Sequence, residues 1–131
     1  MNNHQTKFEN YTRALVKLRE GILKCDENDD LDRDGLIQRF EFTFELAWKT
    51  LQAMFENEGL IGLNSPKTVL KEALKAGLID DEEIWLKMLT DRNSTAHIYN
   101  ERMAIEICNR IRQAHEMPLE QLAVRIEKRI K

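Results

Sequence analysis

The chain has 131 residues, of which 42% are hydrophobic and 33% are charged, with only 5 Gly and 2 Pro. This length suits one domain with its own core and is too short for two. The scarcity of turn residues disfavours a β-rich fold and favours helices with densely charged exposed faces. The formal net charge of −3 conceals an asymmetry, because residues 1–91 carry an excess of Asp and Glu and residues 92–131 an excess of Lys and Arg. Scattered basic residues on helices are more often solvated than bound to RNA, so the charge alone identifies no partner.

The cysteines and the chain start bear on the cellular compartment. Cys25 and Cys108 are isolated, and two such residues make a poor disulfide framework, so both are expected to be reduced thiols. The polar start of the chain lacks the apolar core of a signal peptide, and no run approaches the roughly 18 apolar residues of a membrane span. We therefore expect a cytoplasmic protein without membrane contact.

A first amphipathic helix is predicted over residues 5–25. Apolar side chains recur there at three- and four-residue steps, namely Phe8, Tyr11, Leu15, Leu18 and Ile22. The acidic stretch from Asp26 to Asp34 interrupts this pattern and is predicted to be a solvated connection. Asp32 or Asp34 would then be the N-cap of the following helix.

A second helix is predicted over residues 36–57, although its Phe-rich start also alternates with the period of a strand. Helical spacing persists over several turns, and no Gly or Pro bounds a strand; the positions are Leu36, Phe40, Phe44, Ala47, Leu51 and Met54. Phe42 and Leu46 then fall on the opposite side, so this helix is apolar on two faces and needs two covers. The bundle supplies one cover, and a second subunit can supply the other.

Shorter helices are predicted after a loop at 57–64. Capping residues, glycine and proline mark their ends: Ser65-Pro66 and Gly77 for the third, Asp80 and Asp81 for the fourth, Asn100 or Glu101 for the fifth, and Pro118 for a break before the last. The prediction is a single all-α domain over residues 1–131, an up-and-down antiparallel bundle of about five to six helices.

Arg92 occupies a position of the fourth helix where an apolar side chain is expected. It lies four residues after Met88, on the stripe that begins with Trp85 and Met88. A charge that points inward needs a partner. The structural explanation is an arginine at a helix end that pairs with a carboxylate such as Asp91.

His97 follows so closely that helical geometry bears on whether both residues can meet one ligand. On an ideal helix His97 would lie about 140° around from Arg92, at roughly 100° per residue. The helix must therefore end or bend between them. Ser94 and Thr95 are weak helix formers, and they lie where such a break is needed.

Arg92, His97 and Tyr99 match the R-x4-H-x-Y motif of HEPN domains (higher eukaryotes and prokaryotes nucleotide-binding). The chain resembles the HepT-type toxins, also described as nucleotidyltransferase substrate-binding proteins. The segment 38–49, QRFEFTFELAWK, is typical of that group, and the resemblance covers most of the chain. The R-x4-H pattern is a weak signal alone and a strong one together with this helix.

The resemblance implies a helical homodimer in which the motifs of two subunits face each other across a cleft. It implies a metal-independent endoribonuclease that needs no cofactor. Arg92 would bind the scissile phosphate, His97 would act as general acid or base, and Asn93 would orient the phosphate or the histidine. The ribose 2′-OH would be the nucleophile. A small partner nucleotidyltransferase would transfer AMP onto Tyr99 and silence the toxin, because anionic bulk repels RNA.

A second hypothesis is a binding subunit without nuclease activity. Such a protein would present a substrate, or Tyr99, to a partner nucleotidyltransferase. The sequence is compatible with both hypotheses.

A remote alternative is calcium binding. Asp30, Asp32, Asp34 and Glu41 fit the template D-x-D-x-D-G-x5-E without a mismatch. However, residues 36–40 also begin the apolar stripe of the second helix, and no second loop of this kind is found. A helical conformation there would prevent the loop from wrapping around a cation.

Other ionisable residues are predicted to have no catalytic role. Glu41 and Glu45 are one turn apart, but a surface pair between Glu45 and Lys49 is favoured over a catalytic carboxylate pair. His4 and His115 are isolated in the sequence.

Overall fold

The computed structural model describes residues 3–98 and 100–131. The helices in this part of the chain are α1 (Asn3–Lys24), α2 (Asp30–Asn57), α3 (Pro66–Lys75), α4 (Glu82–Ser94), α5 (Glu101–Arg110) and α6 (Glu116–Ile130). A 3-10 turn, η1 (Thr95–His97), follows α4, and a π turn, η2 (Ile111–His115), joins α5 to α6. The described residues contain no strand, so the all-α prediction is confirmed.

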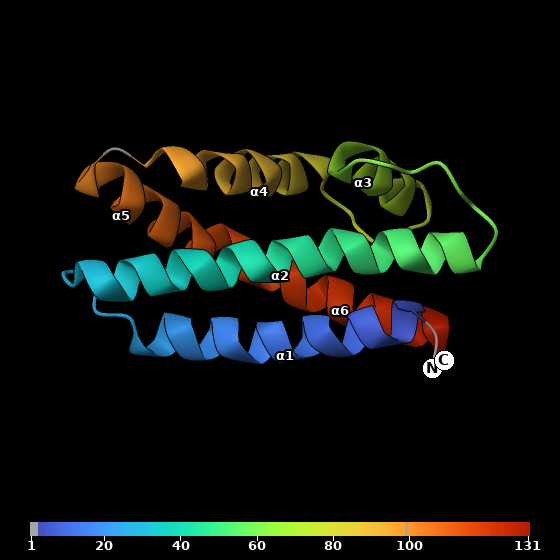
Figure 1. The fold of residues 1–131 in the computed structure, drawn as a ribbon, viewed down its shortest axis with the longest axis horizontal. Helices are drawn as coiled ribbons and strands as arrows, with labels where there is room; N and C mark the ends of the chain where they lie inside the picture. The colour runs from blue at the N-terminus through green and yellow to red at the C-terminus, as the bar shows by residue number, and fades with distance from the viewer. Residues whose placement is uncertain (1–2, 99) are drawn as a thin grey trace.

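The long helices form an up-and-down antiparallel bundle (Figure 1). The chain runs along α1, returns along α2, crosses through the short α3, runs back along α4 and returns through α5 and α6. The first and last helices have their free ends at the same end of the bundle (Figure 1). Helix α2 lies in the middle and packs against α1, α3, α4, α5 and α6.

The central position of α2 explains its two apolar faces. One face is almost fully buried, through Leu36, Phe40, Phe44, Ala47, Leu51 and Met54. Burial of each large side chain contributes about 1.5–3 kcal/mol. On the opposite face Leu46 is half-buried, and Phe42 remains 59% exposed. The chain's own bundle therefore leaves part of the second face uncovered.

Helix α2 begins earlier than predicted, so the N-cap prediction was wrong. Its N-cap is Asp29, whose Oδ1 accepts hydrogen bonds from the amides of Leu31 (2.9 Å) and Asp32 (3.2 Å). Asp32 and Asp34 lie inside the helix. The reason is that carboxylates in a first turn stabilise a helix through its dipole, so an acidic run can begin a helix.

This early start also contradicts the calcium alternative. Asp30, Asp32, Asp34 and Glu41 all lie within α2, where the backbone cannot wrap around an ion. Within residues 3–98 and 100–131, no group of three or more acidic, His or Cys side chains is arranged to hold a metal ion.

The ends of the shorter helices agree with the prediction, because each is set by local hydrogen bonds. Ser65 and Thr68 form a reciprocal capping box at the start of α3, and Gly77 beyond its end has a φ of +75°. The Asp81 Oδ1 accepts from the amide of Ile84 at 3.2 Å and caps α4. In the same way, Asn100 caps α5.

Pro118 does not mark a break, and that prediction was wrong. It is the third residue of α6, which continues directly from the π turn η2. Proline has no amide hydrogen and its ring crowds the carbonyl one turn earlier. The wider hydrogen bond from the amide of Glu116 to the carbonyl of Ile111 lies just before it, so the helix is irregular there without being interrupted.

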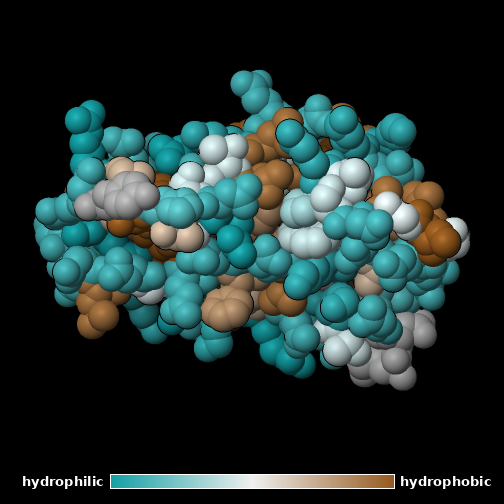
Figure 2. All heavy atoms as spheres, turned by 45° about the horizontal axis from the view of Figure 1, so that its top comes forward, coloured by the Kyte–Doolittle hydropathy of each residue, from teal (hydrophilic) through white to brown (hydrophobic). Residues whose placement is uncertain are grey.

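The face on which α3 and α4 lie is mostly hydrophilic, with separate apolar patches (Figure 2). None of the described helices combines the length and the apolar character needed to cross a membrane.

Candidate functional site

The candidate site lies where α4 ends, and the helix ends where the sequence predicted. Helix α4 stops at Ser94, and the 3-10 turn η1 carries His97. The Thr95 hydroxyl donates to the carbonyl of Arg92 at 2.7 Å, and the Ser94 hydroxyl donates to the carbonyl of Thr90 at 2.9 Å. Both hydroxyls thus bond to backbone carbonyls one turn earlier, and the amide of Thr95 also donates to the carbonyl of Arg92 in the tighter 3-10 pattern. The predicted break between Arg92 and His97 is confirmed.

Arg92 points toward α2. Its Nη2 lies 3.4 Å from Oε1 of Glu45, whose Oε2 lies 3.7 Å from Nζ of Lys49. The predicted pair of Glu45 with Lys49 is therefore confirmed, but Glu45 also holds Arg92, and Asp91 does not pair with Arg92. The Nε of Arg92 is buried and has no hydrogen-bond partner among the described residues. A ligand oxygen would reach this donor only after a shift of the side chain, which as a whole is 32% exposed.

A surface pocket of about 430 Å³ lies beside this guanidinium. Apart from Arg92, its lining comes from one face of α2, namely Asp34, Gln38, Glu41, Phe42 and Glu45. The only cation among these residues is Arg92, whose side chain is 32% exposed. The pocket thus combines one cation with a carboxylate-rich wall.

The remaining motif residues lie around this helix end. Asn93 and His97 are exposed. The predicted modification site, Tyr99, lies outside the described residues. Its neighbours are held in place, because Ile98 packs against the core and the Asn100 Oδ1 accepts from the amide of Met103 at 2.9 Å.

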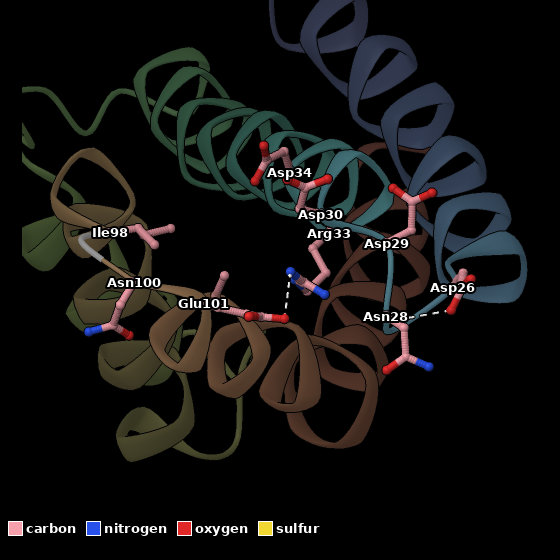
Figure 3. Close-up of a pocket in the computed structure, with 10 residues that line it drawn as sticks. Asp26, Asn28, Asp29, Asp30, Arg33, Asp34, Ile98, Asn100 and Glu101 are labelled. Carbon is pink, nitrogen blue, oxygen red and sulfur yellow. Dashed lines mark hydrogen bonds and ion pairs between the residues drawn. The ribbon is translucent and has the colours of Figure 1, made fainter.

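A larger pocket of about 750 Å³ lies next to Ile98 and Asn100 (Figure 3). Carboxylates from the start of α2 and from the preceding connection line it, and Asp34 also lines the Arg92 pocket. Arg33, only 4% exposed, spans it, with Nη2 3.3 Å from Oε1 of Glu101 and Nη1 2.6 Å from the carbonyl oxygen of Glu27. Arg33 thus links the start of α2 to the start of α5.

A buried polar cluster lies behind Arg92. Asp91 is 1% exposed and accepts two hydrogen bonds from Arg110, from Nε to Oδ2 at 2.8 Å and from Nη2 to Oδ1 at 2.9 Å. The Nε2 of His115 lies 2.7 Å from Oδ2 of the same carboxylate. The His115 ring is fully buried and stacks on Phe40, with 5.3 Å between ring centroids. His115 is therefore not the isolated residue that the sequence suggested.

The ionisation of Asp91 follows from these contacts. Burial raises its pKa, but hydrogen bonds from His115 and Arg110 and the charge of Arg110 outweigh burial and lower the pKa to about 2. The hydrogen bond between Arg110 and Asp91 also raises the pKa of Arg110. The cluster thus keeps a carboxylate charged inside the protein next to the motif arginine.

The sequence contained a signal for this cluster. Asp91 lies three residues after Met88, and Arg92 lies four residues after it. Both spacings continue the apolar stripe of α4, so either residue could point inward. His115 lies four residues after Ile111 and four before Leu119, both buried. A polar residue in such a stripe indicates a buried hydrogen bond.

Comparisons with known proteins agree with this fold. Residues 6–128 match the model of the family described as "Nucleotidyltransferase substrate binding protein like". A Haemophilus influenzae protein named "Probable ribonuclease HepT" is 35% identical over 77 residues, which are 56% of this chain and 53% of that protein. The chain thus spans about half the length of this curated relative.

Two solved structures are also similar. One, from Thermus thermophilus, is 41% identical, with a TM-score of 0.78 over 88% of this chain and 97% of that one. The other is the toxin–antitoxin MntA–HepT, in which a chain 17% identical to this one gives a TM-score of 0.79 over 95% of this chain and 97% of that one. The family match covers nearly the whole chain, and this protein therefore belongs to the nucleotidyltransferase substrate-binding protein-like family.

Proposed function

We propose that this protein is a HEPN endoribonuclease, the toxin of a toxin–antitoxin pair, and that it cleaves RNA without a metal ion. The observation that carries the proposal is the end of α4, where the Arg92 side chain is 32% exposed and lines a pocket, and His97 follows on the next turn. The similarity to a protein named as a probable ribonuclease supports it, as does the fold shared with a toxin–antitoxin chain.

In the proposed reaction, the guanidinium of Arg92 binds the scissile phosphate and stabilises its developing negative charge. The ribose 2′ oxygen attacks phosphorus, and the bond from phosphorus to the 5′ oxygen breaks. One group accepts the proton of the 2′-OH, and another donates a proton to the leaving 5′ oxygen; His97 performs one of these transfers. Asn93, exposed beside Arg92, orients the phosphate or the imidazole. The products are a 2′,3′-cyclic phosphate and a 5′-OH end.

The working site, in this proposal, needs two copies of the chain. Carboxylates of Asp34, Glu41 and Glu45 surround Arg92 in its pocket, so one chain offers a phosphate little net attraction. A second copy would bring another Arg92 and another His97. Phe42, which lines the same pocket and is 59% exposed, provides an apolar surface for this contact.

The partner, we propose, is a small nucleotidyltransferase that transfers AMP from ATP to the hydroxyl of Tyr99 and releases pyrophosphate. The added phosphate would place negative charge next to the RNA site and oppose binding of the RNA backbone. The family description supports a nucleotidyltransferase as the partner. Because RNA and ATP meet in the cytoplasm, the proposal places the pair there.

RNA cleavage by the partner-free protein tests the nuclease proposal. We expect the wild type to cleave RNA in the presence of EDTA and to leave 2′,3′-cyclic phosphate ends. Arg92→Gln and His97→Ala should each lower the rate on the order of 10²–10⁴-fold. Arg102→Gln is the matched control, because the Arg102 side chain is exposed and pairs only with Glu106 among the described residues. Equal activity of the wild type and His97→Ala would refute the proposal.

The second candidate function is a binding subunit without nuclease activity, which the family description favours. In that case pure wild-type protein would show no cleavage that depends on His97. It would still bind its partner and be modified on Tyr99. The cleavage assay therefore separates the two functions, and modification of Tyr99 shows that a protein without cleavage activity is still folded and able to meet its partner.

A further inference from the structure

The buried cluster behind Arg92 is more elaborate than packing at this position requires. A charged Asp91 inside the protein must be matched by donors, and Arg110 and His115 supply three close hydrogen bonds, while Nζ of Lys87 lies 3.8 Å from Oδ1. Replacing such a cluster with apolar side chains often leaves a protein equally stable. Stability alone therefore does not explain why the chain places an ion pair here.

The cluster fixes how the end of α4 is rotated. Successive residues of an α-helix point about 100° apart. Asp91 points toward α5 and η2, where Arg110 and His115 hold it, so Arg92 points toward α2 and lies 3.4 Å from Glu45. A rotation of the last turn of α4 would carry the Arg92 guanidinium out of its pocket.

We propose that Asp91, Arg110 and His115 are positioning residues that hold Arg92, through the last turn of α4, in the orientation that binds the phosphate. This inference rests on the proposed function. It concerns residues outside the R-x4-H-x-Y motif, and none of the three is expected to touch RNA, because Asp91 and His115 are buried and Arg110 bonds to Asp91.

The π turn η2 supports this assignment. It is the segment that delivers His115 to Asp91, and π turns inside helices are frequent at functional sites. The Nδ1 of His115 is buried without a hydrogen-bond partner among the described residues. The ionised Asp91 carboxylate can only accept, so Nε2 of His115 carries the hydrogen in this contact and the imidazole serves as a donor to Asp91.

The variants that test this role keep the core filled. His115→Phe retains a ring against Phe40 and removes the donor, whereas His115→Gln retains an N–H group. Arg110→Lys retains the charge and loses the two-pronged geometry of the guanidinium. Two controls lie far along the bundle: Arg129→Lys, which loses the equivalent two bonds to Glu58 at 2.9 and 2.8 Å, and Leu70→Ala, which makes a cavity under α3.

Two measurements are made on each full-length variant, well below its Tm. The first is kcat and KM for RNA cleavage. The second is the NMR signal of the Arg92 Nε–H group, assigned by its loss in Arg92→Lys and followed as inorganic phosphate is added.

We expect His115→Phe and Arg110→Lys to lower kcat roughly tenfold to 10²-fold, as small misplacements of a catalytic group do, and to shift the Arg92 signal. His115→Gln should recover part of the loss. Arg129→Lys and Leu70→Ala should keep the wild-type kcat and the wild-type Arg92 signal, even where their Tm is lower.

The role is overturned if kcat follows Tm through all five variants, or if the Arg92 signal is the same in His115→Phe, Arg110→Lys and the wild type. Absence of cleavage by the wild type would instead refute the nuclease proposal. The Arg92 signal then still decides the positioning role, so the two failures are distinguishable.

Discussion

The carboxylate of Glu45 lies 3.4 Å from the guanidinium of Arg92, where a phosphate oxygen would lie if RNA were bound as proposed. Both side chains are about one third exposed, 32% and 31%, so the pair is in contact with solvent and is expected to be weak. The other carboxylate oxygen of Glu45, Oε2, lies 3.7 Å from Nζ of Lys49. In the proposed complex Glu45 would compete with the phosphate for Arg92, and its contact with Lys49 would remain.

Removing this competitor should strengthen phosphate binding. We expect Glu45→Gln to raise the affinity for a short RNA roughly two- to fivefold at low salt, which corresponds to loss of an exposed ion pair of about 0.5–1 kcal/mol. Glu41→Gln is the control, because Glu41 lines the same pocket and no ion pair joins it to Arg92. Fluorescence anisotropy with His97→Ala as the background prevents cleavage during the titration. Weaker binding by Glu45→Gln than by Glu41→Gln would show that Glu45 supports the site instead of competing for it.

Much of the fold was predictable because local rules set it. The ends of α3, α4 and α5 follow from Ser65, Asp81 and Asn100, whose side chains cap amides a few residues away. The break between Arg92 and His97 was predictable for the same reason, because Ser94 and Thr95 bond to nearby carbonyls.

The sequence-based predictions were wrong where several local rules compete, or where the outcome depends on residues distant in the sequence. An acidic run can be a loop or a first helical turn, and the dipole of α2 decided in favour of the helix that begins at Asp30. The inward charge of α4 is Asp91, one residue before the predicted Arg92. Which of the two is buried depends on Arg110 and His115, and no periodicity within α4 reveals residues on another helix.

The uncovered face of α2 leads to a prediction about assembly. Phe42 is 59% exposed beside the Arg92 pocket, so a second copy of the chain should cover it. We expect the wild type to sediment as a dimer, and Phe42→Glu to be monomeric and to cleave RNA at least roughly tenfold more slowly. Val124→Glu is the control, because it also replaces an exposed apolar side chain with a glutamate. Val124 lies in α6, is 53% exposed and does not line the pocket, so this variant should remain dimeric and active. A dimeric Phe42→Glu protein would place the contact between subunits elsewhere.

Tyr99 provides a test of regulation that does not depend on cleavage. The chain has 2 Tyr, and Tyr11 is fully buried. After incubation with the partner nucleotidyltransferase and ATP, we expect mass spectrometry to find one AMP on the wild type and on Tyr11→Phe, and none on Tyr99→Phe. The Tyr99→Phe protein should keep its nuclease activity in the presence of the partner. Modification of another residue in Tyr99→Phe would remove Tyr99 as the control point.

The buried Asp91 predicts how stability depends on pH. Its pKa is lowered from 3.8 to about 2 in the folded protein. Because the folded pKa lies below the unfolded one, Asp91 contributes stability above about pH 4, and this contribution is lost as the pH falls toward 2. The shift corresponds to about 2 kcal/mol in the free energy of unfolding. The Asp91→Asn variant has no carboxyl group at this position, so its stability lacks this dependence on pH.

Urea unfolding at a series of pH values measures the effect. The free energy of unfolding should be lower in Asp91→Asn than in the wild type near neutral pH, because the variant leaves Arg110 without its carboxylate, and the difference should shrink by about 2 kcal/mol between about pH 4 and pH 2. Glu58 and Asp80 also have lowered pKa values, but they titrate in both proteins and cancel in the difference. Parallel stability curves for the two proteins would mean that Asp91 is not held ionised by Arg110 and His115.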